Sequence, residues 1–199
     1  MLSHIFGLFI NPKQEWQKIH DSECSVTRCY LSYVLILAAI PPLSGYFGTT
    51  IFGWQLGARD AVKLSSESAL IIAIAYYLIM LVGVFTMGLM VQRMGEAYGA
   101  EQPLSRTVTL AAYTATPLFL VGVFELVPIL WLKFLAGLPA LGYSVVLLYT
   151  GLPIMMGISE EKGFLFSSAV LAVGLVTLVC MMVATDILWG YGFVPQFVN

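Results

Sequence analysis

The chain has 199 residues and a net charge of −2, and 59% of its residues are hydrophobic while only 10% are charged. A soluble domain carries about 25% charged residues, so this composition excludes a soluble globular monomer and predicts a protein embedded in a lipid bilayer. The sequence also lacks a basic run that would track phosphates, which argues against nucleic-acid binding.

The first residues, 1–28, are expected to form a cytoplasmic segment that precedes the membrane-spanning part. Asn11 is suited to cap a helix that has Pro12 at its first position. We therefore expect two short amphipathic helices within residues 2–20 that lie on the membrane surface. The alternative is a frayed, partly ordered terminus. The candidate interfacial anchor consists of Trp16, Lys13 and Lys18.

Charged residues divide the following sequence into five apolar runs, each able to hold the roughly 20 residues of a spanning helix. Only helices and closed barrels satisfy the backbone in hydrocarbon, and these runs lack the alternation of barrel strands. The sequence thus predicts an all-α polytopic membrane protein, with a five-helix domain over residues 29–190 and a far-side tail, 191–199. The expected transmembrane helices cover residues 30–49, 69–91, 110–131, 134–156 and 164–186.

The placement of Lys and Arg predicts the orientation. Six of these residues fall on the side of the N-terminus and three on the opposite side. Positive charge collects on the cytoplasmic side, so we expect a cytoplasmic N-terminus and a periplasmic C-terminus. Trp54, Trp131 and Trp189 then fall at the far-side ends of spans, where an interfacial aromatic belt is expected.

Cysteine and histidine residues do not form a catalytic or metal-binding pattern. The three cysteines, Cys24, Cys29 and Cys180, are too few and odd in number for a disulfide framework. His20, Cys24 and Cys29 are a weak metal-ligand set, because residues five apart do not share a helix face. The sequence contains no nucleophile–base set or phosphate loop, so we expect no enzymatic activity, no metal and no cofactor.

Prolines interrupt the predicted spans. A proline in a helix removes one N–H and frees the carbonyl four residues earlier, which needs another partner in lipid. We therefore expect three of the five helices to be kinked or locally unwound. The prolines in question are Pro41 and Pro42 in the first span, Pro117 and Pro128 in the third, and Pro139 and Pro153 in the fourth.

Polar residues on the third and fourth spans predict a buried polar seam. We expect these spans to form an antiparallel hairpin that turns near Lys133, with Glu125 opposite Tyr143 and kept neutral by burial. Hydroxyl groups of the seam would satisfy the carbonyls that proline frees. An acid within the membrane could instead serve as a proton or cation relay, or reach toward the far interface. The predicted seam consists of Tyr113, Thr114, Thr116, Pro117, Glu125, Tyr143, Ser144, Tyr149 and Thr150.

Small residues recur at helical spacing on the last two predicted spans. Such stripes let helix backbones approach closely, either within the chain or in self-association with a second copy. The alternative is that membrane helices are simply rich in glycine. The two stripes are Gly137, Ser144 and Gly151, and Gly163, Ser167 and Gly174.

Four strings of the sequence carry a resemblance to a known family. They are FINPKQEW, YLSYVLILAAIPPLSGYFG, AYTATPLFL and GYSVVLLYTGLPIMM, and they include Tyr113 with Pro117 and Tyr149 with Gly151 and Pro153. In these features the chain resembles the Yip1 domain family, and most closely its bacterial inner-membrane members. The resemblance implies five spans but no defined biochemical activity. Eukaryotic relatives act with Rab-type GTPases, but their Asp-Leu-Tyr-Gly-Pro motif is absent here, so the resemblance implies no GTPase binding.

Two functions follow as alternatives. The surface helices, the small-residue stripes and the resemblance favour a non-enzymatic membrane scaffold or adaptor that contacts the lipid bilayer and other membrane proteins. The proline-broken helices and Glu125 favour a small transporter or channel linked to protons or cations. Against transport, five spans do not divide into two equal inverted repeats.

Overall fold

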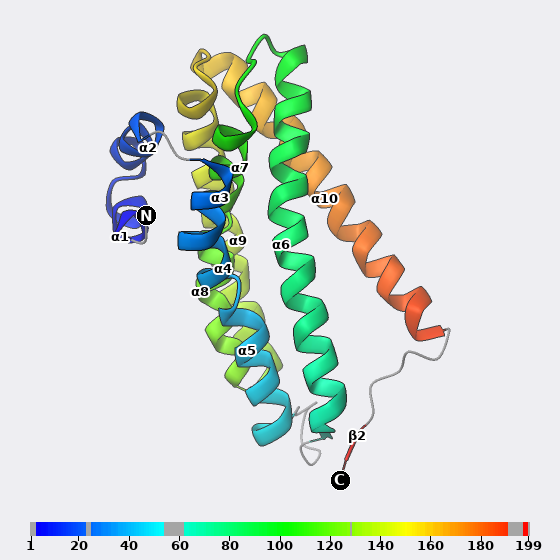
Figure 1. Ribbon diagram of the computed structural model, residues 1–199. Coiled ribbons are helices and arrows are strands. Elements are labelled where there is room, and N and C mark those ends of the chain that lie inside the picture. Colours follow the sequence, from blue (N-terminus) through cyan, green and yellow to red (C-terminus); the bar gives the residue numbers. More distant parts are fainter. Residues whose placement is uncertain (1–2, 23–24, 54–61, 128, 191–196, 199) are drawn as a thin grey trace.

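The structure, a computed structural model, describes residues 3–22, 25–53, 62–127, 129–190 and 197–198 (Figure 1). These residues are almost entirely helical, as the sequence predicts. Strands among them are limited to β1 (Lys63–Leu64) and β2 (Phe197–Val198), which pair in antiparallel fashion.

The N-terminal segment forms two short helices, α1 (His4–Ile10) and α2 (Pro12–Asp21). Asn11 separates them, and its side-chain oxygen accepts a hydrogen bond from the Gln14 N–H at 3.4 Å. Pro12 occupies the first turn of α2, where its missing N–H is not needed. The predicted pair of helices and the predicted cap are therefore confirmed.

The first long apolar segment runs from Val26 to Phe52 and is broken near its centre. The break falls at Ala38 and Ala39, just before Pro41 and Pro42 in the first turn of the next helix. The prolines therefore interrupt this segment, as expected. Its successive elements are α3 (Val26–Cys29), the π-helical turn η1 (Tyr30–Val34), α4 (Leu35–Leu37), α5 (Ile40–Phe47) and the π-helical turn η2 (Gly48–Phe52).

The second segment is the uninterrupted helix α6 (Ser66–Ala97), which forms one side of the bundle in Figure 1. The third segment is broken at Ala115, two residues before Pro117. Its elements are α7 (Leu104–Thr114), α8 (Thr116–Val121) and the 3₁₀ turn η3 (Gly122–Leu126).

The turn between the third and fourth segments corrects the expected boundaries. Helical structure ends at Leu126, and α9 (Leu130–Met156) begins before Lys133. Trp131 and Lys133 thus lie in the first turns of α9, not at the end of the third span and in a turn. Val127 is extended, with φ −94° and ψ 129°, the conformation imposed on a residue that precedes a proline.

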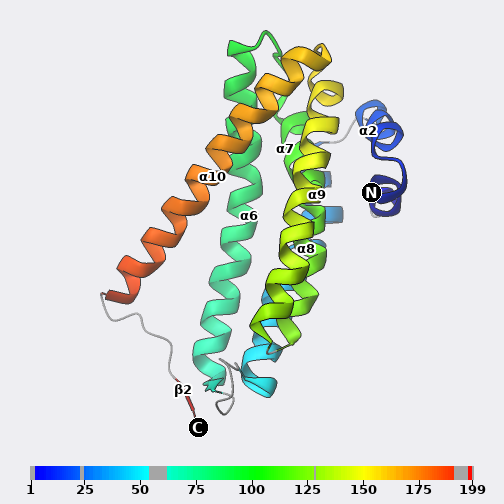
Figure 2. The same ribbon diagram turned by 180° about the vertical axis from the view of Figure 1, so that it is seen from behind.

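Helix α9 contains Pro139 and Pro153 and ends at Gly157, whose φ of +68° is the left-handed geometry of a helix C-cap. The last helix, α10 (Glu160–Gly190), begins beside the end of α9 and diverges from α6 toward its own C-terminal end (Figure 2).

Four helical segments of the described residues are long and apolar enough to cross a membrane: Val26–Phe52, Ser66–Ala97, Leu104–Leu126 and Leu130–Met156. They correspond to the first four predicted spans. The fifth predicted span, 164–186, falls within α10, and its crossing stays a prediction. Trp54 lies outside the described residues.

The buried core lies between α2, the first segment, α7, α9 and the start of α10. Its largest fully buried side chains include Trp16, Tyr33, Tyr113 and Phe166. Most of α6, in contrast, exposes its apolar residues, which is the surface that a lipid-facing helix presents.

Candidate functional site

Trp16 joins the N-terminal helices to the helix bundle. Its side chain is fully buried, and its indole ring lies so close to Gly151 of α9 that a Cβ there would overlap the ring. The ring also meets Tyr113 edge-on, with centroids 6.2 Å apart. Trp16 therefore packs into the bundle and is not the interfacial anchor that its amphipathic helix predicts. Only a glycine at position 151 leaves room for this contact.

Helix α1 packs against the middle of α9. The Tyr143 hydroxyl donates to the Leu8 carbonyl at 2.7 Å, and the Phe9 ring stacks on Tyr143 with centroids 5.1 Å apart and planes 9° apart. Leu8 is fully buried. Helix α1 therefore packs on the side of α9, and its position relative to the membrane surface stays a prediction. Figure 1 shows α1 beside the bundle, below α2.

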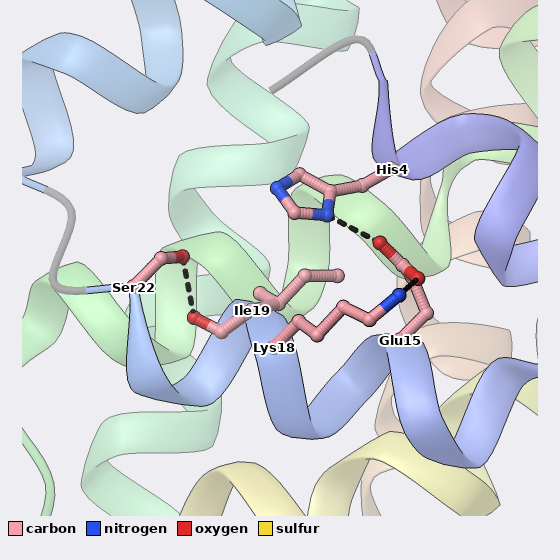
Figure 3. A network of polar contacts seen from close by, with 5 residues as sticks. All are labelled: His4, Glu15, Lys18, Ile19 and Ser22. Atoms are coloured by element: carbon pink, nitrogen blue, oxygen red, sulfur yellow. Dashed lines mark hydrogen bonds and ion pairs between the residues drawn. The ribbon is translucent and has the colours of Figure 1, made fainter.

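A buried carboxylate links α1 to α2 (Figure 3). Glu15 is 7% exposed; one carboxylate oxygen contacts His4 Nδ1 at 2.5 Å and the other accepts from Lys18 Nζ at 2.9 Å. The carboxylate also fills the space over Gly7, where a Cβ would overlap it. Lys18 therefore serves this intramolecular pair, although its side chain stays 65% exposed.

The same contacts determine the ionisation of Glu15. Burial alone would raise the pKa of this carboxyl, but the hydrogen bonds from Lys18 and His4 outweigh burial, and the pKa lies below its ordinary value of 4.5. The sequence gives one signal for this site. Glu15 precedes Ile19 by four positions and so occupies the apolar face that Trp16 and Ile19 define.

Lys13, the third predicted anchor residue, bridges to the start of α10. Its ammonium group lies 3.0 Å from Glu160, and both side chains are largely exposed, at 65% and 84%. An exposed pair of this kind contributes at most about 1 kcal/mol. It nevertheless gives α2 a second point of contact with the bundle.

Three residues of the first and third segments form a buried hydroxyl cluster. Thr116 Oγ1 donates to the Tyr113 carbonyl at 2.7 Å, and the Tyr33 hydroxyl lies 2.6 Å from Thr116 Oγ1. Because the only hydroxyl hydrogen of Thr116 goes to the carbonyl, Tyr33 is the donor of the second bond. The Tyr113 carbonyl is the group that Pro117 deprives of its helical partner. Sequence reasoning had brought Tyr113, Thr116 and Pro117 together but had missed Tyr33.

The other residues of the predicted seam have separate partners. The Tyr149 hydroxyl meets Ser168 Oγ at 2.8 Å, and Thr150 donates to its own helix at the Val146 carbonyl. Ser144 and Thr114 bury their hydroxyl oxygens, and neither oxygen has a hydrogen-bond partner among the described residues. The structure thus distributes the predicted seam over several sites and does not join it into one network.

Glu125 forms an ion pair that replaces the predicted contact with Tyr143. Its carboxylate lies 2.7 Å from Lys133 Nζ, and the two side chains are 36% and 19% exposed. The pair exists because the turn falls before Lys133, which places this lysine beside the end of η3. The expectation that Glu125 lies opposite Tyr143 is corrected accordingly.

The small-residue stripes contribute in part to close packing. Gly151 receives Trp16, and Gly163 faces Pro153, whose Cβ would lie 2.7 Å from an added Cβ. Gly137 has no atom within 4 Å of an added Cβ. Close approach therefore occurs where α9 meets α2 and α10, and Gly137 lies in open space.

The weak metal-ligand set is not assembled within the described residues. His20 Nδ1 lies 3.1 Å from Asp21, and Cys29 is buried, while Cys24 lies outside the described part of the chain.

Long apolar helices broken at prolines, with hydroxyl groups that satisfy a freed carbonyl, define a polytopic helical membrane protein. The chain belongs to the Yip1 domain family, whose model matches residues 6–181. It is 40% identical over 192 residues to the inner membrane protein YohC of Escherichia coli K12 and to that of E. coli O6:H1 strain CFT073, and each alignment covers 96% of this chain and 98% of the relative. No solved structure matches the chain at a significant level.

Proposed function

We propose that the chain is a non-enzymatic scaffold or adaptor of the bacterial inner membrane, with five spans, a cytoplasmic N-terminus and a periplasmic C-terminus. Support for the location comes from the relatives, which are inner membrane proteins by name. Support for the orientation comes from the six Lys and Arg residues on the side of the N-terminus.

The docking of Trp16 against Gly151 carries the proposal. It fixes α2 to the bundle by its buried face, with Trp16 and Ile19 inward. The opposite face of α2 presents exposed Gln14 and Gln17. A scaffold needs a polar surface held in a constant position relative to its membrane anchor, and this arrangement supplies one.

Crosslinking in native membranes tests the proposal. A photoreactive residue in place of Gln17 is expected to capture one reproducible protein neighbour. The same residue in a Trp16→Ala background is expected to lose that neighbour, because α2 is no longer held. A full-length chain that captures no reproducible protein at Gln17 would contradict the scaffold role. Reporter fusions at both ends test the five spans, which require the ends to lie in opposite compartments.

Transport is the competing function, and it needs Glu125 to exchange a proton or a cation. The ion pair with Lys133 gives Glu125 a structural partner at the end of the third segment. This contact supports a role for Glu125 in closing the turn between η3 and α9.

A further inference from the structure

A polar cavity of about 440 Å³ lies where the end of α2, the start of α3 and the first turn of α7 meet. Met155 of α9 forms part of its wall. The cavity is separate from the contact between Trp16 and Gly151, and the scaffold proposal does not use it. Its polar lining consists of His20, Ser22, Ser25, Ser105, Arg106 and Thr109.

Arg106 gives this cavity a positive charge. One guanidinium nitrogen, Nη1, donates to the neutral side-chain oxygen of Gln102 at 2.7 Å. A guanidinium carries five N–H donors, so this bond leaves others available. No carboxylate belongs to the described residues that line the cavity, and Asp21, which contacts His20, points its largely exposed side chain to solvent. Arg106 is therefore the arginine that this lining supplies to a ligand.

Hydroxyl groups add neutral donors beside Arg106. Ser25 Oγ accepts from the Arg28 N–H, and its own hydrogen has no acceptor among the described residues. The Ser105 hydroxyl also lines the cavity, next to Arg106 in the first turn of α7. Thr109 and Ser22 also line the cavity, but their hydroxyl hydrogens already donate to backbone carbonyls. A guanidinium with adjacent hydroxyl donors matches a tetrahedral oxyanion, which Arg can bind through two parallel bonds.

The position of the cavity fits a ligand at the membrane surface. Arg106 lies in the first turn of the candidate membrane span Leu104–Leu126, so the cavity lies at one end of that span. The N-terminal end of α7, a helix of 11 residues, adds a partial positive charge. We propose that this cavity binds a phosphate group, supplied either by an anionic lipid headgroup or by a free phosphoryl compound.

The full-length protein in lipid nanodiscs tests the site. The first arm measures retention of phosphatidylglycerol by native mass spectrometry, and the second measures binding of inorganic phosphate in phosphatidylcholine nanodiscs by calorimetry. Arg106→Gln is expected to weaken binding by at least about tenfold in the arm that detects it. Arg93→Gln is the matched control, because Arg93 is an exposed arginine of α6 that does not line the cavity.

Each outcome decides the proposal. Binding in the first arm alone identifies a lipid headgroup, and binding in the second identifies free phosphate; either supports the site if Arg106→Gln weakens it and Arg93→Gln does not. Equal losses in both variants would show general attraction to positive charge and overturn it, as would no binding in either arm. If Arg106→Gln does not fold, as judged by thermal unfolding, Arg106→Lys decides. Arg106→Lys keeps the positive charge but lacks the planar guanidinium group. Phosphate affinity should therefore fall if the cavity binds phosphate specifically, and stay unchanged if binding is only a general attraction to positive charge.

Discussion

The indole ring of Trp16 lies against the backbone of Gly151, and this contact, together with those of Leu8 and Phe9 to Tyr143, joins the N-terminal helices to the fourth membrane segment. The fit is tight because α9 presents no side chain at that position. Substitution of Trp16 or Gly151 should therefore weaken or strain the packing of α1 and α2 on the bundle.

Replacement of Gly151 by alanine should destabilise the protein by about 1–3 kcal/mol, the typical cost of overpacking a filled site. The added methyl group would overlap the Trp16 ring. Thermal unfolding in detergent measures the loss, and proteolysis at Lys13 and Lys18 reports the release of α2. Gly137→Ala is the control on the same helix, because an added Cβ there has no atom within 4 Å. Equal melting temperatures for the two variants would contradict the close packing at Gly151.

Stability should depend on the ionisation of Glu15. Because its folded pKa lies below the ordinary value of 4.5, ionised Glu15 stabilises the folded protein above that pH, and the contribution is lost as the pH falls through the folded pKa. Melting temperatures measured from about pH 7 to about pH 3 should fall less steeply for Glu15→Gln than for the native chain. Glu96→Gln, an exposed acid of α6, should keep the native slope. If the melting temperature of Glu15→Gln falls with pH as steeply as that of the native chain, Glu15 does not cause the pH dependence.

The Tyr33–Thr116 bond should contribute measurably to stability because both groups are buried. Thr116→Val leaves the Tyr33 hydroxyl and the Tyr113 carbonyl without this partner, at a cost of about 1–3 kcal/mol. Thr150→Val is the matched control, since Thr150 bonds only within its own helix at the Val146 carbonyl. A double-mutant cycle with Tyr33→Phe should show coupling between Tyr33 and Thr116. Strict additivity would mean that this hydrogen bond has no energetic role.

Glu125→Gln should leave proton and cation leak in liposomes unchanged, at the level of protein-free liposomes, if the scaffold function holds. The substitution removes a partly exposed ion pair with Lys133 and should cost at most about 1 kcal/mol of stability. Glu67→Gln, an exposed acid in the first turn of α6, serves as control. A native leak above the protein-free level that Glu125→Gln abolishes, while Glu67→Gln keeps it, would establish transport instead.

Charge spacing and proline positions predicted most of the helical layout. Pro41 and Pro117 each lie in the first turn after a break, where proline is tolerated better than in a helix interior. Pro139 and Pro153, in contrast, lie inside the continuous helix α9, so the expected local unwinding of the fourth span is not seen.

The charge of Lys133 predicts a turn there, but the turn directly follows Leu126 and Lys133 lies within α9. The proline at position 128 restricts Val127 to an extended backbone, and this restriction sets the turn. The long side chain of Lys133 can contact Glu125 from within a helix, so its charge does not mark the turn.

The packing of the N-terminal helices could not be predicted from the sequence. An amphipathic helix with Trp16 on one face has the same pattern whether that face meets lipid or protein. Gly151 likewise reads as an ordinary glycine of a membrane helix. Only the tertiary structure shows that the Trp16 ring fills the space above Gly151.

The docked N-terminal helices also impose an order on biogenesis. Leu8 and its partner Tyr143 are 135 positions apart in the chain, and Lys13 and Glu160 are 147 apart. At translation rates of about 5–20 residues per second, the first helices wait on the order of ten seconds for α9 to be made. During that time their apolar side chains must be sheltered by the insertion machinery or by lipid. These helices thus leave the ribosome before α9 but reach their final position only after it.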